Sequence, residues 1–111
     1  MKGENIGELE ELVLLTVGAL HREAYAVLIL EELRNSSNRV MDVTAVHSVL
    51  RRLEKKGFVS SEMRGATAER GGRRKRFFSL TTSGRKVLDE TMHLRMSLYS
   101  KLPKLTFSVV S

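Results

Sequence analysis

Residues 43–80 constrain the fold of this chain more than any other stretch. They carry an amphipathic helical pattern, then a glycine, then two strand-like runs on either side of an arginine-rich loop. Ten of the nineteen basic residues lie between positions 51 and 76, against three acidic residues, while the rest of the chain has nine basic and ten acidic residues. This concentration of positive charge favours a polyanionic partner over an evenly solvated basic surface. A helix with cations on one face, followed by a basic hairpin, is typical of a reader of double-helical DNA.

The first part of this stretch predicts a helix over about 43–56. Asp42 is a good N-cap, and Gly57 suits the left-handed position that follows the end of a helix. The apolar row consists of Val43, Val46, Val49, Leu50 and Leu53. The other face carries the candidate DNA-reading residues, most of them at spacings of three and four, so that they can face one groove: Thr44, His47, Ser48, Arg51, Arg52 and Lys55. Arg51 is the candidate for a bidentate contact to guanine, whereas Arg52 and Lys55 are expected to position the backbone.

The second part predicts a β-hairpin with strands at about 58–64 and 75–80. The connecting segment contains the adjacent Gly71 and Gly72 and is expected to be a mobile tip whose backbone can approach phosphate closely. Five cations at this tip and along the second strand are expected to contact the DNA backbone or the minor groove, where arginine is favoured. They are Arg70, Arg73, Arg74, Lys75 and Arg76.

The flanking residues predict helices at 8–20 and about 24–35 before this stretch and at about 83–102 after it. The order α-α-α-β-β-α, with a polar face on the third helix, indicates a mainly α, winged helix-turn-helix fold. We expect residues 1–82 to form the DNA-binding domain and residues 83–111 to form a C-terminal helix and a short tail. Leu28 and Leu30 lie on the side of the second helix that should be exposed to solvent. They are explained either by ordinary surface hydrophobicity or by contact with a partner subunit.

The last helix begins after Thr81 or Thr82 and ends at Pro103. Its double apolar row exceeds what a small winged-helix core can cover, which predicts a homodimer, although the helix can also fold back on the first helix. The expected dimerisation residues are Val87, Leu88, Thr91, Leu94, Leu98 and Leu102. The tail at 104–111 is apolar and β-prone, but its place in the fold does not follow from the sequence.

Several classes of function are not supported by the residues. The chain has no cysteine, and its three histidines are far apart, so neither a metal site nor a cofactor is expected. The acid pairs Glu10–Glu11 and Glu31–Glu32 are expected on outward helix faces, without the shared cleft that acid–base catalysis needs. Phosphate-binding and nucleophile motifs are absent, so we do not expect an enzyme. The N-terminus has neither a signal peptide pattern nor a membrane span, which predicts a cytoplasmic protein.

With these elements in place, the sequence resembles the PadR family of bacterial transcriptional regulators. The resemblance covers about residues 7–100. It is carried by GELEELVLL at 7–15, AYAV at 24–27, AVHSVLRRLEKKGFV at 45–59 and, above all, ERGGRRKRFFSLT at 69–81 with Gly84. It implies a dimeric winged helix-turn-helix repressor of the short type, with a single C-terminal dimerisation helix, a palindromic operator and often a small-molecule or stress effector. The chain departs from the family at His47, where tyrosine is usual, at Ala26, where glycine is frequent, and in lacking tryptophan at 92–102.

These observations predict a sequence-specific regulator of transcription that binds a pseudo-palindromic operator in double-stranded DNA as a homodimer. We expect a repressor, released by an effector whose class the sequence does not indicate. Two alternatives stay open. A winged-helix module whose basic hairpin binds RNA would prefer A-form RNA to duplex DNA, and a protein–protein interaction module would show no salt-dependent DNA binding.

Overall fold

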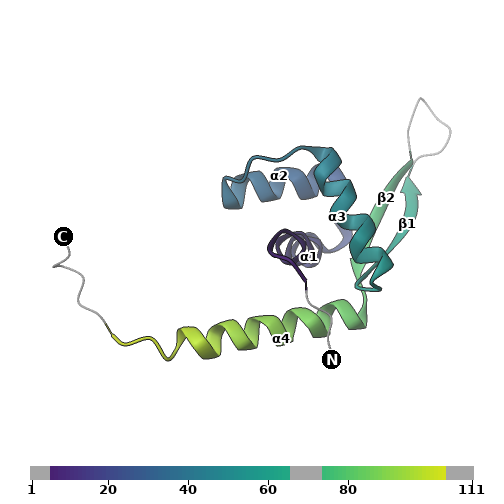
Figure 1. The fold of residues 1–111 in the computed structure, drawn as a ribbon. Coiled ribbons are helices and arrows are strands. Elements are labelled where there is room, and N and C mark those ends of the chain that lie inside the picture. Colours follow the sequence, from purple (N-terminus) through teal and green to yellow (C-terminus); the bar gives the residue numbers. More distant parts are fainter. Residues whose placement is uncertain (1–5, 66–73, 105–111) are drawn as a thin grey trace.

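The computed structural model describes residues 6–65 and 74–104. It contains four α-helices, namely α1 (Glu8–Leu20), α2 (Ala26–Ser37), α3 (Val43–Lys55) and α4 (Thr82–Tyr99), and a short 3-10 turn, η1 (His21–Glu23). Two antiparallel strands, β1 (Val59–Gly65) and β2 (Arg74–Leu80), form a hairpin that projects beyond α3 (Figure 1). The predicted order of elements is confirmed, and the fold is a mainly α winged helix.

Local signals set most of the helix ends. The Asp42 carboxylate accepts a hydrogen bond from the Ala45 N–H at 3.0 Å, and Gly57 has a φ of +83° just after α3. The hydroxyl of Thr81 accepts from the Gly84 N–H at 3.0 Å, so Thr81 and not Thr82 caps α4. Each of these residues satisfies a backbone group that the helix itself leaves unpaired. The last helix ends at Tyr99, earlier than the expected residue 102.

The second helix begins two residues later than predicted because Ala24 is hydrogen-bonded to β2. The Phe78 N–H donates to the carbonyl oxygen of Ala24 at 2.8 Å, so residues 24 and 25 run extended beside β2. Tyr25 has extended backbone angles and its ring meets that of Phe77 edge-on, with centroids 5.2 Å apart. This tertiary pairing outweighs the helical propensity of alanine at position 24.

The core lies between α1, α2 and α3 on one side and the hairpin on the other. Leu14, Ile29, Leu50 and Leu53 are its largest fully buried side chains. Leu30 is also buried, at 8% exposure, and both interpretations of it as a surface or partner-contact residue are therefore wrong. The reason is that α2 packs against both α1 and α3, which needs a wider apolar face than a two-layer arrangement.

Helix α4 contributes apolar side chains to this core only from its first half. It starts at the base of the hairpin, which is the wing of this fold, passes α1 and runs away from the hairpin toward the C-terminus (Figure 1). Gly84 and Leu88 are buried in the protomer, whereas Leu94, Met96, Leu98 and Tyr99 are more than half exposed. No helix in the described parts of the chain is long and apolar enough to span a membrane.

Candidate nucleic-acid interface

The polar face of α3 is turned to solvent because its apolar row is buried. Val46, Val49, Leu50 and Leu53 are at most 2% exposed and pin one side of the helix to the core. Four of the six predicted reading residues are then exposed without a side-chain partner among the described residues, and they share the opposite side of the helix. These four are Thr44, His47, Arg51 and Lys55.

Arg52 and Ser48 are more restrained than the other predicted reading residues. The Nε of Arg52 donates to a carboxylate oxygen of Glu10 at 3.2 Å, and its Nη1 lies 3.3 Å from the Ser48 hydroxyl. Lys56 donates to both carboxylate oxygens of Glu10, at 3.0 and 3.2 Å. Because these bonds hold the end of α3 against α1, they fix the angle at which α3 is presented. The Arg52 side chain stays 52% exposed, so contact with a backbone phosphate is still open to it.

Glu10 and Glu11 were expected on an outward face, and the structure contradicts this. Each residue is only 7% exposed. Glu11 binds Arg95 of α4 through two contacts, at 2.7 and 3.1 Å. Two adjacent carboxylates of α1 therefore hold α3 and α4, one each.

The electrostatics of Glu10 keep this carboxylate ionised. Burial by itself raises the pKa of Glu10, but the Gly7 N–H, Lys56 and Arg52 all donate to the charged form and lower the pKa below its ordinary value. A general acid or base working near neutral pH needs the opposite shift. Glu10 is therefore a structural ion-pair partner and not a catalytic group.

The hairpin places its described cations on both of its faces. In the register of the two strands, Met63 lies opposite Arg76 and Gly65 opposite Arg74. Arg74, Lys75 and Arg76 are all exposed, and the Lys75 ammonium lies 4.6 Å from the centre of the Tyr25 ring. The other two predicted wing cations, Arg70 and Arg73, and the glycines at 71 and 72 lie outside the described residues.

A hydrogen-bond chain connects the hairpin to α3. Arg76 donates to the Ser61 hydroxyl at 3.0 Å, and that hydroxyl donates to the Glu54 carboxylate at 2.8 Å. These hydrogen bonds thus run from β2 through β1 to α3. Sequence reasoning assigned no role to Ser61 or Glu54, although Glu54 is the only acid on α3, which was a usable signal.

The predicted dimerisation residues divide into two groups. Leu88 is 5% exposed and lies in the core of its own protomer, and Val87 and Thr91 are half-buried. Leu94, Leu98 and Leu102 are 57–62% exposed. At about 100° per residue, Leu94 and Leu98 lie roughly 80–120° around α4 from Leu88. The described chain therefore buries one stripe of α4 and leaves the neighbouring apolar stripe uncovered.

Nothing in the described residues resembles a metal centre. No group of three or more histidine, aspartate or glutamate side chains there could hold a metal ion.

Comparison with known proteins agrees with this geometry. The sequence profile of the transcriptional regulator PadR-like family matches residues 13–90. No curated protein matches the sequence significantly.

Three solved structures illustrate the structural similarity. A PadR family transcription regulator from Clostridium difficile is 19% identical, with a TM-score of 0.71 over 85% of this chain and 93% of that one. A PadR-like transcription factor from Bacteroides fragilis is 26% identical, with a TM-score of 0.68 over 83% and 84% of the chains. A Streptococcus transcriptional regulator is 23% identical, with a TM-score of 0.67 over 84% and 86%.

Proposed function

This chain belongs to the PadR-like family of transcriptional regulators, which are not enzymes, and from this premise we propose that it is a homodimeric repressor that binds a pseudo-palindromic operator in double-stranded DNA. One observation carries the proposal. The helix with the most sharply divided faces, α3, buries its apolar row and presents Thr44, His47, Arg51 and Lys55 free to solvent beside a basic hairpin.

The proposed contacts differ in what they read. Arg51 has no partner among the described residues and can form a bidentate contact to a guanine edge, worth about 1–3 kcal/mol of discrimination. Thr44, His47 and Ser48 lie nearer the start of α3, where such helices touch bases or nearby phosphates. Arg52 and Lys55 then contact the phosphate backbone of the DNA. The wing cations Arg70, Arg73, Arg74, Lys75 and Arg76 add sequence-independent affinity through counterion release.

The exposed stripe of α4 supports the homodimer. Leu94 and Leu98 lie on the second half of α4 and Leu102 lies just beyond its end, and covering them with a second copy removes apolar surface from water at about 25 cal/mol per Å². Twofold symmetry would place two α3 helices in successive major grooves about one turn apart, with the hairpins on the flanking backbone. The repressor role rests on the family resemblance. An effector would shift the dimer between spacings that fit and do not fit the operator.

Binding of duplexes selected from a random library, measured by fluorescence anisotropy over a range of salt, tests the proposal. A dimer that makes about eight phosphate contacts should show a slope of log K against log salt of roughly −7. A flat slope would sink the proposal in favour of a protein-interaction module, and preference for A-form RNA would favour the RNA-binding alternative.

Arg51→Ala separates base reading from backbone contact. It should reduce affinity for the selected site while leaving random DNA nearly unaffected. Lys86→Ala is the charge-matched control, because Lys86 is exposed on α4 and belongs to neither α3 nor the hairpin. Equal losses on selected and random DNA would make Arg51 a backbone contact.

Leu94→Glu tests the dimer. It places a charge in the exposed stripe and should give a monomer by light scattering. Met96→Glu is the matched control, since Met96 is 62% exposed but lies on nearly the opposite side of α4, about 200° from Leu94. If both variants stay dimeric, another surface forms the dimer.

A further inference from the structure

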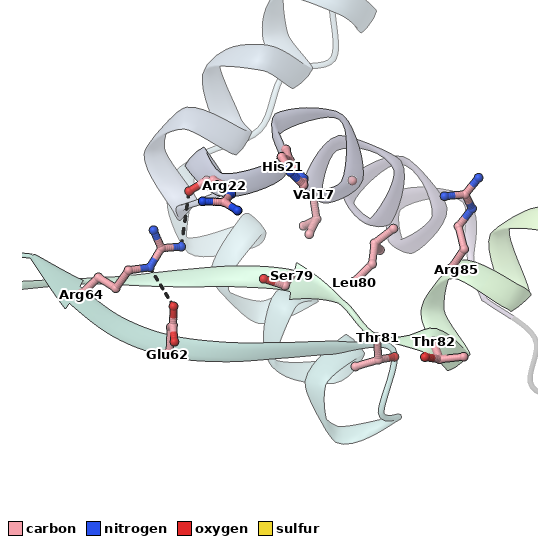
Figure 2. Close-up of a pocket in the computed structure, with 11 residues that line it drawn as sticks. Val17, His21, Arg22, Glu62, Arg64, Ser79, Leu80, Thr81, Thr82 and Arg85 are labelled. Carbon is pink, nitrogen blue, oxygen red and sulfur yellow. Dashed lines mark hydrogen bonds and ion pairs between the residues drawn. The ribbon is translucent and has the colours of Figure 1, made fainter.

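A hollow of about 790 Å³ lies beside the hairpin, within the size range of small-molecule sites. It is bounded by the end of α1, by η1, by the two strands and by the first turn of α4 (Figure 2). No residue of α3 lines it. A molecule bound there would therefore leave the proposed DNA-reading face free.

The walls of this hollow carry an excess of positive charge. Arg22, Arg64 and Arg85 line it, and Glu62 is the single acid among the lining residues. Figure 2 shows Arg22 and Arg64 on one side of the hollow and Arg85 on the other. His21 and the hydroxyls of Ser79, Thr81 and Thr82 add further polar groups.

The three arginines differ in what already holds them. The guanidinium of Arg22 has no hydrogen-bond or ion-pair partner within the described residues. Arg85 pairs with Asp89 at 3.0 Å, but both side chains are more than 60% exposed, so the pair is weak. Arg64 contacts Glu62 at 2.8 Å and the Arg22 carbonyl at 3.3 Å, and stacks 3.9 Å above the Phe77 ring. Two of the three arginines are thus available to an incoming anion, and the third is already oriented.

The hollow is not uniformly polar. Leu80 contributes aliphatic surface beside the nearly buried Val17, and the absence of a side chain at Gly18 leaves room for Leu80, since a Cβ at this position would lie 2.9 Å from it. Helix α4 starts at Thr82 in the wall, so the positive end of its dipole adds to the arginines. An aliphatic patch beside paired cations matches a ligand with a small apolar body and one oxyanion group.

We propose that this hollow binds a small organic anion, a carboxylate or phosphate ester with a short aliphatic body, and that it is the effector site of the regulator. The regulatory part rests on the proposed function, whereas the binding itself does not. The lining comes from the hairpin, from α1, from η1 and from α4. In the proposed dimer, the relative placement of these elements would set the spacing of the two α3 helices. An anion that draws Arg64 away from the Arg22 carbonyl would change how β1 is held against η1 and shift the population of dimer geometries.

Isothermal titration calorimetry of the full chain at fixed ionic strength tests the site, with hexanoate and hexyl phosphate as probes and hexanamide as the uncharged counterpart. We expect saturable binding of at least one anion and none of hexanamide. Arg22→Gln and Arg85→Gln should each weaken binding about tenfold, as loss of a charge-assisted hydrogen bond does. Lys86→Gln, which removes the same charge next to Arg85 but outside the lining, should bind like the wild type.

The site is refuted if neither anion binds below about 10 mM, if hexanamide binds equally well, or if Lys86→Gln weakens binding as much as Arg22→Gln. Fluorescence anisotropy with DNA on the same proteins separates this inference from the proposed function. DNA binding without anion binding would overturn the effector site alone. Anion binding without DNA binding would uphold the site and overturn the proposed function.

Discussion

Replacing Gly84 with alanine should destabilise this protein, against the usual effect of that change in a helix. Gly84 lies in the first turn of α4, against the loop that follows α3. A Cβ at this position would lie 2.0 Å from the carbonyl oxygen of Phe58 and 2.9 Å from its carbonyl carbon, whereas ordinary contacts begin at 3.4 Å. The obstacle is backbone, so no rotation of a side chain relieves it.

The loss of stability can be estimated from the contacts that are disturbed when the backbone at Gly84 moves away from Phe58. Separation of Gly84 from Phe58 strains two hydrogen bonds at the start of α4, from the Thr81 N–H to the Phe58 carbonyl at 3.1 Å and from the Thr81 hydroxyl to the Gly57 carbonyl at 2.6 Å. Each is worth about 0.5–1.5 kcal/mol, and overpacking costs about 1–3 kcal/mol. Alanine stabilises a helix by about 1 kcal/mol relative to glycine, which offsets part of this loss. The expected net loss is about 1–5 kcal/mol.

Urea unfolding followed by circular dichroism, at one fixed protein concentration, measures this loss. Gly18→Ala is the matched control, because Gly18 is also helical and its added Cβ meets only the flexible end of Leu80, at 2.9 Å. We expect Gly18→Ala to change stability by less than about 1 kcal/mol. A Gly84→Ala protein as stable as the wild type would refute the close approach of α4 to Phe58 and, with it, the anchoring of the C-terminal helix.

Three further substitutions test the contacts that hold α3 and α4. Since the pKa of Glu10 is lowered in the folded protein, the unfolded state binds the proton more readily, so the stability that this carboxylate adds is full above its ordinary pKa of 4.5 and is lost as the pH falls through the folded value. Glu10→Gln should therefore lower the free energy of unfolding, measured in urea at pH 7, by about 1–2 kcal/mol. The difference in stability between wild type and variant should become smaller in acid, and a difference independent of pH would contradict this. Arg95→Gln removes the partner of the buried Glu11 carboxylate and should speed amide exchange along the second half of α4, while unchanged exchange would make the pair incidental. Asp42→Ala removes the cap of α3 and should lower stability by about 1 kcal/mol in thermal unfolding, whereas an unchanged midpoint would show that the cap is dispensable.

The carboxylates of α1 show where sequence reasoning stopped short. Glu10 precedes Val13 and Leu14 by three and four residues, which puts it on the buried face of the helix. This spacing is visible in the sequence and could have predicted that position. The charge of the Glu10 side chain favoured a solvent-exposed position, because a buried charge needs a partner that the local sequence does not reveal. The partners are Lys56, 46 positions away, and, for the neighbouring Glu11, Arg95, 84 positions away.

The sequence by itself determined the order of the elements, the ends of α3 and the start of α4, and the position of the positive charge. These features depend on caps, glycines and periodicity that act within about four residues. Only the tertiary structure decided that residues 24 and 25 pair with β2, that Leu30 is buried and that Gly84 must lack a side chain. It also brought Arg22, Arg64 and Arg85 around one hollow. Each of these outcomes depends on which distant segment packs against a residue, and that is set by the arrangement of the whole chain.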